Sequence, residues 1–274
     1  MRQTRELTPE QIKEVSLKLL IQFDRLCRDN GIRYSLGMGT LLGAVRHGGF
    51  IPWDDDVDVI MTRPEYQKLL RIDKALLPRD CALFSIERER LFTAPLAKLI
   101  DTTTVLYQTD HVERIPLGIY IDIFVYDALP ADRRQWDKTF RRGDTLQRLW
   151  TASEMKPVPG EKNPVKIGYK HLAARLDLAR FFAGKLSRYA QRVPFENGAH
   201  VANLYYSTFP RNKFTFPRAA TEQFRDICFE GHWFTAFEDT DLFLRAWYGD
   251  YMKLPPREQR KGHHKYSAYC RGES

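Results

Sequence analysis

The sequence predicts a mixed α/β (α+β) fold, in which a mixed sheet with flanking helices is followed by a more helical part. Up to about residue 130, amphipathic helix patterns alternate with short runs of β-branched and aromatic residues. From residue 131 the texture becomes mainly helical. A chain of 274 residues is also long enough to bury one large core with an appended lobe.

The first predicted element is a helix that begins at Pro9. Thr8 has the side chain of an N-cap, Pro9 suits the first helical position, and Gln11 stands where a capping box requires it. Asn30 and Gly31 end the helical pattern. The apolar residues recur on one face, which we expect to cover the sheet: Ile12, Val15, Leu19, Phe23 and Leu26.

A strand, a glycine turn and a short helix are predicted next. Residues 32–38 alternate apolar with small or polar side chains, and residues 41–47 have a helical pattern. Gly39 and Thr40 would then lie at the N-terminus of that helix. Free backbone N–H groups at such a position can hold a phosphate, and glycine lets the backbone approach closely. We therefore expect Gly39 and Thr40 to bind phosphate.

Four aspartates within five residues, at positions 54, 55, 56 and 58, stand at the start of an apolar strand. If this run is extended, Asp54, Asp56 and Asp58 point one way, and the valines at 57 and 59 point into the core. Carboxylates crowded in this way repel one another unless a cation lies between them, and their oxygens suit Mg²⁺ or Mn²⁺. The alternative is a charged turn before a strand. Whether Asp54 or Asp55 would reach the metal stays open, because the sequence does not fix where the loop ends.

The remaining core elements follow from the same patterns. Thr62 and Pro64 mark the start of a second helix. Strands are expected near residues 82–86, 96–100, 103–107 and 120–125, where they would complete the mixed sheet. Asp122 is the lone charge in the last of these runs. A carboxylate there is costly to bury unless it binds a cation or strong hydrogen-bond donors.

The run from residue 36 to residue 58, LGMGTLLGAVRHGGFIPWDDDVD, resembles the signature of the LicD family. This is the phosphorylcholine-transferase-type branch of the nucleotidyltransferase-fold superfamily. The superfamily usually has Gly or Ser at the place of Thr40, and Thr keeps the hydroxyl. Shorter segments that also resemble the family lie at residues 98–101, 118–124, 229–231, 248–256 and 263–264. The resemblance implies a nucleotidyltransferase-like catalytic core over residues 1–130.

The resemblance also implies a metal site with a third carboxylate from a later strand, for which Asp122 is the candidate. Asp56, Asp58 and Asp122 are thus the expected catalytic residues, and together with Asp54 they are the expected metal ligands. The expected cofactor is Mg²⁺ or Mn²⁺.

Basic residues beside the predicted cradle extend the phosphate site. Arg46 and Lys98 each lie near it, and a cation there would offset phosphate charge. His263 and His264 could contact phosphate or supply a proton, although paired histidines in a tail are as often only solvated. Trp53 is expected to pack at the strand entrance, and Asp250 is a weaker site candidate.

The part after the core is locally basic. Residues 131–192 contain fifteen Lys or Arg against six Asp or Glu, whereas the whole chain carries a net charge of +8. Such a surface could hold phosphates of a nucleotide or a lipid-linked acceptor, or could dock near an anionic membrane, or could be an ordinary solvated helical surface. We expect a basic, mainly helical insertion over 131–217 and a segment returning to the core over 218–274.

The predicted site combines carboxylates, a divalent metal and a phosphate cradle, and it contains no nucleophilic side chain. This combination fits phosphoryl transfer. The resemblance implies a LicD-type phosphotransferase that moves phosphorylcholine, or a similar phosphoalcohol, from a CDP-activated donor such as CDP-choline to a sugar hydroxyl. The acceptor would be a cell-surface glycan or lipid-linked precursor, as in lipopolysaccharide or teichoic acid biosynthesis, and CMP would be released. The alternatives are a nucleotidyltransferase acting on a small molecule or protein, and a non-catalytic nucleotide-binding regulator.

The composition bears on the cellular location of the protein and on the role of its cysteines. No apolar stretch approaches the roughly 20 residues needed to span a bilayer, so we expect a cytoplasmic protein, with peripheral contact at the inner membrane face as an option. The four cysteines are widely spaced and form no Cys-x-x-Cys pair, which argues against a zinc site or a disulfide framework. No nucleic-acid-binding motif accompanies the basic segment.

Overall fold

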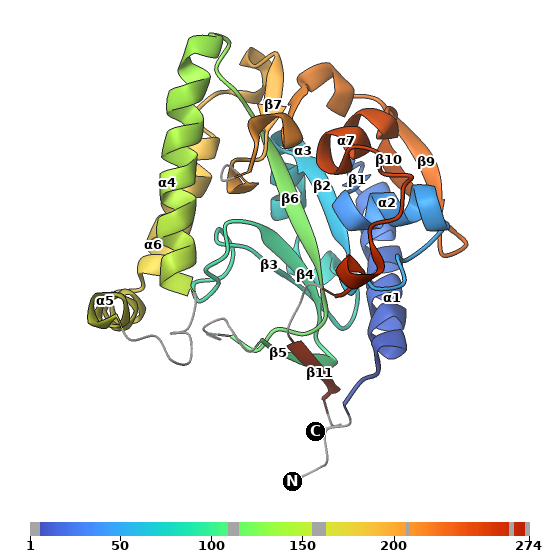
Figure 1. The fold of residues 1–274 in the computed structure, drawn as a ribbon. Coiled ribbons are helices and arrows are strands. Elements are labelled where there is room, and N and C mark those ends of the chain that lie inside the picture. The colour runs from blue at the N-terminus through green and yellow to red at the C-terminus, as the bar shows by residue number, and fades with distance from the viewer. Residues whose placement is uncertain (1–5, 109–114, 155–162, 207–208, 263–265, 272–274) are drawn as a thin grey trace.

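In the computed structural model, a seven-stranded mixed sheet stands at the centre with helices packed around it (Figure 1). The structure describes residues 6–108, 115–154, 163–206, 209–262 and 266–271. The chain is therefore of the α+β class, as the sequence predicts.

The elements are labelled in chain order. The α-helices of the described residues are α1 (Pro9–Asp29), α2 (Met38–His47), α3 (Arg63–Arg71), α4 (Trp136–Glu154), α5 (Pro164–Arg175), α6 (Leu178–Ala190) and α7 (Thr240–Tyr248). The strands are β1 (Ser35–Leu36), β2 (Asp58–Thr62), β3 (Cys81–Phe84), β4 (Ala97–Asp101), β5 (Thr104–Gln108), β6 (Tyr120–Ala128), β7 (His200–Ala202), β8 (Thr215–Pro217), β9 (Phe224–Phe229), β10 (His232–Phe237) and β11 (Tyr266–Cys270).

The main sheet has the order β1-β2-β6-β4-β3, with β7 paired to β6 and β8 paired to β7. The pairing of β2 with β6 is parallel, and that of β4 with β6 is antiparallel. One expectation is wrong here. The strand at 103–107 does not join this sheet, because β5 pairs antiparallel with β11 near the C-terminus. The pairing partner lies more than 150 residues away along the chain, so no local pattern could reveal it.

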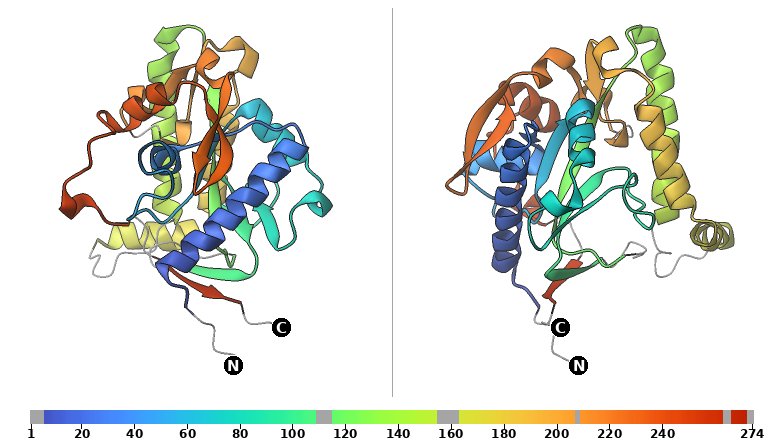
Figure 2. Two further views of the ribbon diagram at one scale, coloured as in Figure 1. Left: turned by 90° about the vertical axis from the view of Figure 1, so that its right-hand side faces the viewer. Right: turned by 180° about the vertical axis from the view of Figure 1, so that it is seen from behind.

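Helix α1 begins as predicted. The Thr8 hydroxyl accepts a hydrogen bond from the Gln11 backbone N–H at 3.3 Å, and the Gln11 side chain accepts one from the Thr8 N–H at 3.0 Å. This reciprocal pair satisfies two N–H groups that the helix itself leaves free. Leu19 and Phe23 are fully buried on the face toward the sheet. In the right-hand view of Figure 2, α1 and α3 lie over the sheet.

The predicted boundary between strand and helix is wrong by several residues. Strand β1 covers only two residues, and α2 already begins at Met38 with Gly37 as its N-cap. The Gly37 N–H donates to the Asp58 carbonyl at 2.9 Å, and a Cβ on Gly37 would lie 2.8 Å from the Ile60 side chain. The chain therefore turns into the helix at the point where it crosses β2. Gly39 and Thr40 lie within the first turn of α2 rather than before it.

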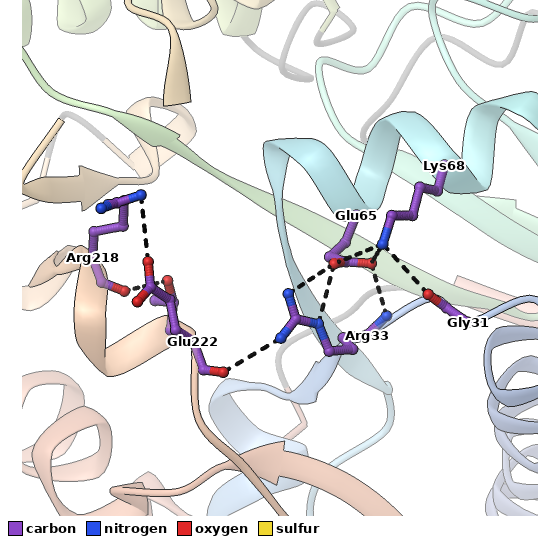
Figure 3. Close-up of polar contacts among 7 residues, drawn as sticks. Gly31, Arg33, Glu65, Lys68, Arg218 and Glu222 are labelled. Carbon is purple, nitrogen blue, oxygen red and sulfur yellow. Dashed lines mark hydrogen bonds and ion pairs between the residues drawn. The ribbon is translucent and has the colours of Figure 1, made fainter. Parts of the chain in front are cut away.

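Two ion-pair clusters fix α3 against the sheet. Buried Glu65 accepts hydrogen bonds from the Arg33 backbone and guanidinium and from Lys68 at 3.0–3.2 Å (Figure 3). Arg63 forms a bidentate pair with Asp127 at 2.6 and 2.7 Å, which joins the first residue of α3 to the end of β6. The first cluster anchors α3 to the segment before β1, and the second ties the end of β2 to the end of β6.

Helices α4, α5 and α6 form a lobe on one side of the sheet (Figure 1). Strands β9 and β10 form a hairpin, and α7 packs beside α2 on the other side. None of the helices that the structure describes combines the length and the apolar composition of a membrane-spanning segment.

Candidate active site

Three charged side chains form a row across the centre of the sheet. Asp58 on β2 is paired in register with Asp122 on β6, and Asp122 is paired with Lys98 on β4. Residues paired in this way point to the same face of a sheet. Lys98 Nζ lies 2.5 Å from Asp122 Oδ1 and 3.3 Å from the centroid of the Tyr120 ring. The structure thus brings Lys98 onto Asp122, where it neutralises that carboxylate.

The chain just before β2 adds further carboxylates to this row. Asp54, Asp55 and Asp56 each offer an oxygen, and these oxygens lie within 4.8 Å of one another. Asp54, Asp56 and Asp58 line a single cleft of about 660 Å³, while Val57 and Val59 are fully buried. The alternation predicted for an extended run therefore holds, although the strand itself begins only at Asp58. Asp55 is held by its backbone, because its carbonyl accepts a hydrogen bond from the Tyr266 hydroxyl at 2.7 Å.

The crowding of carboxylates has a clear electrostatic effect. Burial, followed by the charges of Asp56 and Asp55, raises the pKa of Asp54 to about 7. Burial, followed by the charges of Asp56 and Asp122, raises the pKa of Asp58 well above its usual range. Both raised pKa values mean that the ionised form of the carboxylate is disfavoured in the metal-free protein. A divalent cation bound between these oxygens would remove that penalty, so the donor set fits a hard metal ion such as Mg²⁺ or Mn²⁺.

Helix α2 forms the wall opposite the aspartates. Gly39 lines the cleft, and a Cβ at this position would lie only 2.5 Å from Asp54 Oδ2. Only a glycine lets the helix and that carboxylate come so close. Thr40 is buried, and its hydroxyl accepts a hydrogen bond from the Asp58 backbone N–H at 2.9 Å. In this structure the Thr40 hydroxyl fixes the start of β2, and Thr40 is not among the described residues that line the cleft. Its contact with phosphate stays a prediction.

Arg46, at the far end of α2, also lines the cleft. Its guanidinium donates a hydrogen bond to the Tyr251 carbonyl at 2.7 Å. Loss of water around Arg46 lowers its pKa, with a smaller contribution from the positive charge of Arg260. The side chain retains further N–H donors that could face a phosphate. His263 and His264, the remaining predicted phosphate contacts, lie outside the described residues.

The segment after α7 forms a third wall that sequence reasoning largely missed. Tyr248, Asp250, Tyr251 and Lys253 all line the cleft. Tyr248 as a whole is 44% exposed, but loss of water around its hydroxyl and the charges of Asp58, Asp54 and Asp56 raise the pKa of that group, which places it near the carboxylates. The available signal was the resemblance of residues 248–256 to the family, because nothing in their local pattern points to the aspartates.

Trp53 packs against the core, as expected, and it also lines the cleft. The Arg260 guanidinium lies 5.5 Å from the centroid of its ring. The cleft therefore combines a carboxylate floor with aromatic and cationic walls. Such a site can hold a metal ion together with a phosphate ester.

Comparisons with known proteins agree with this geometry. The family model for the LicD/FKTN/FKRP nucleotidyltransferase domain matches residues 31–158, a range that contains α2, the aspartate run, Lys98 and Asp122. The lipopolysaccharide cholinephosphotransferase LicD of Haemophilus influenzae is 30% identical over 276 aligned residues, covering 97% of this chain and 99% of that protein.

Two further proteins match over shorter stretches. An uncharacterised protein of Rickettsia prowazekii is 32% identical over 134 residues, or 45% of this chain and 47% of its own length. Human ribitol 5-phosphate transferase FKRP is 66% identical over 29 residues, or 11% of this chain and 6% of its own length. Because one relative matches along almost its whole length and the family model spans the aspartates of the cleft, the chain belongs to the LicD family.

Proposed function

We propose that this protein is a metal-dependent transferase that moves phosphorylcholine from CDP-choline to a sugar hydroxyl of a cell-surface glycan precursor. The observation that carries the proposal is the cluster of Asp54, Asp56 and Asp58 in one cleft, directly beside the Asp122–Lys98 pair. Two relatives support the phosphoalcohol as the transferred group. One is named as a cholinephosphotransferase acting on lipopolysaccharide, and the other as a ribitol 5-phosphate transferase.

In this proposal Asp54, Asp56 and Asp58 hold Mg²⁺ or Mn²⁺, with Asp122 completing the site. When bound, the cation neutralises non-bridging oxygens of the donor diphosphate. Gly39 gives Asp54 room beside α2, and Thr40 fixes the backbone of Asp58. These two residues therefore set the spacing between the carboxylates.

The chemistry needs an attacking hydroxyl and a leaving group. The acceptor oxygen attacks the phosphorus that bears the choline, and the bond from that phosphorus to the bridging oxygen breaks. CMP leaves with the bridging oxygen. Asp122 is the proposed acceptor of the hydroxyl proton, and the adjacent Lys98 keeps this carboxylate oriented. Arg46 and Lys253 on the cleft walls offset the negative charge of the donor phosphates.

The product distinguishes this proposal from its rivals. The purified protein is incubated with Mn²⁺, CDP-choline and a lipopolysaccharide-derived oligosaccharide, and the products are read by mass spectrometry and phosphorus NMR. We expect free CMP and an oligosaccharide that has gained phosphorylcholine. An oligosaccharide that has gained cytidylate would identify a nucleotidyltransferase. Donor binding without any turnover, across CDP-choline and a CDP-activated polyol such as CDP-ribitol, would favour a regulator.

A matched pair of variants tests whether turnover depends on the aspartates of the cleft. Asp56→Asn removes a carboxylate from the cleft, whereas Asp144→Asn removes one on α4, where Asp144 is paired only with its helix neighbour Arg148 among the described residues. Turnover should disappear in the first variant and persist in the second. Equal turnover in both would remove the aspartate cluster from the mechanism.

A further inference from the structure

Helix α5 exposes an apolar stripe. Val165, Leu172 and Leu176 are 77%, 52% and 57% exposed. They are spaced seven and four residues apart, which places them on one face of a helix. Leu176 continues the helical turn beyond the end of α5, since its N–H donates to the Leu172 carbonyl at 2.9 Å. Large apolar side chains that share an exposed face indicate an interaction site.

Helix α5 is attached to the lobe at the edge of this stripe. The Tyr169 hydroxyl and the Ser153 hydroxyl on α4 are 3.0 Å apart, and Ala173 is fully buried. Tyr169 lies one helical turn from Val165 and from Leu172, so the attachment and the stripe share part of one helix face. Figure 1 shows α5 at the outer end of the lobe, beyond the ends of α4 and α6. The three apolar side chains of the stripe remain exposed beside this attachment.

Positive charge accompanies this stripe in the sequence, and a second cationic site lies at the opposite end of α4 (Figure 1). Residues 164–176 include Lys166, Lys170 and Arg175 and contain no acidic residue. The first turns of α4 add a shallow groove of about 480 Å³ lined by Arg134, Lys138, Arg141 and Arg142, whose one acidic member, Asp137, is paired with Arg211. Apolar residues among lysines and arginines are typical of helices that lie in the interface of an anionic bilayer.

We propose that α5 docks on a membrane surface containing anionic phospholipid, with its apolar stripe in the interface and the cationic face of α4 strengthening the attachment. Charge complementarity favours this occupant over a second copy of the chain. Residues 131–192 contain fifteen Lys or Arg and six Asp or Glu, so two such lobes would repel each other. The proposal goes beyond the transfer reaction and does not use the aspartate cleft.

Co-sedimentation with vesicles tests the docking. The full chain is mixed with vesicles of phosphatidylglycerol and phosphatidylcholine, or of phosphatidylcholine alone. We expect binding to the first type, weakened by added salt, and little binding to the second. The double variant Leu172→Asp/Leu176→Asp should bind roughly tenfold more weakly or worse. Leu76→Asp, at a residue that is 60% exposed and far from the lobe in sequence, should bind as the wild type does.

A second measurement reports the position of the helix directly. Leu172→Trp adds a tryptophan to the stripe of a chain that already has five, so its emission is read as the difference between variant and wild type. This difference should shift to the blue only with phosphatidylglycerol vesicles. Absence of binding to those vesicles, or unchanged binding of the double Asp variant, would overturn the proposal. A wild-type dimer that dissociates in the double Asp variant would show that a second copy covers the stripe, and would overturn it too. The variants are also assayed for turnover with water-soluble CDP-choline and oligosaccharide. Normal turnover together with failed vesicle binding would count against the membrane docking alone and not against the proposed reaction.

Discussion

Gly39→Ala is expected to damage the site without damaging the fold. The added Cβ would lie 2.5 Å from Asp54 Oδ2, roughly 1 Å closer than an ordinary van der Waals contact. Because Gly39 lies in helix α2, the carboxylate is the group that must move. A displacement of about 1 Å in a catalytic group can lower turnover roughly 100-fold. Alanine also favours the helix over glycine by about 1 kcal/mol, so the variant should remain folded.

The assay compares three quantities in wild type and variant: melting temperature, Mn²⁺ affinity by calorimetry and the rate of CMP release from CDP-choline with acceptor. The matched control is Gly168→Ala in α5, where an added Cβ meets nothing within 4 Å. It should leave Mn²⁺ affinity and turnover unchanged. A folded Gly39→Ala protein with wild-type metal affinity and turnover would refute the assigned role of Asp54.

Three further outcomes are expected. Without metal, Asp58→Asn should melt no lower than the wild type, because the substitution removes repulsion between carboxylates. The variant should, however, lose most of the rise in melting temperature that Mn²⁺ gives the wild type. A rise as large as that of the wild type would contradict Asp58 as a ligand. Lys98→Met should lower the free energy of unfolding of the metal-free protein by about 3 kcal/mol in urea titrations, since the buried Asp122 carboxylate loses its partner. Unchanged stability would argue against a charged pair. Glu65→Gln should cost about 2 kcal/mol at pH 7, because Glu65 binds Arg33 and Lys68 as a carboxylate. Burial acts to raise the pKa of Glu65, but hydrogen bonds from the Arg33 backbone and from the Lys68 and Arg33 side chains outweigh it, so the pKa is lowered. This advantage of the wild type should therefore persist above the ordinary value of 4.5 and disappear as the pH falls further. A difference that grows toward acid pH would refute the reasoning.

Much of the site could be predicted because its signals are local. The spacing of Asp54, Asp56 and Asp58 places them on one side of an extended chain whichever strand pairs with it. The capping residues of α1 likewise act on their own helix turn, and the structure confirms them. Such features depend only on near neighbours in the sequence.

The sequence by itself determined the family, the α+β class and the alternation that gathers the aspartates, because each is written in residue order and periodicity. Only the tertiary structure decided that Lys98 neutralises Asp122, that the Thr40 hydroxyl holds the Asp58 backbone, and that Tyr248 lines the cleft. It also decided that β5 pairs with β11 instead of joining the main sheet. These contacts join residues 18 to more than 150 positions apart, and their geometry depends on strand register and packing over the whole core.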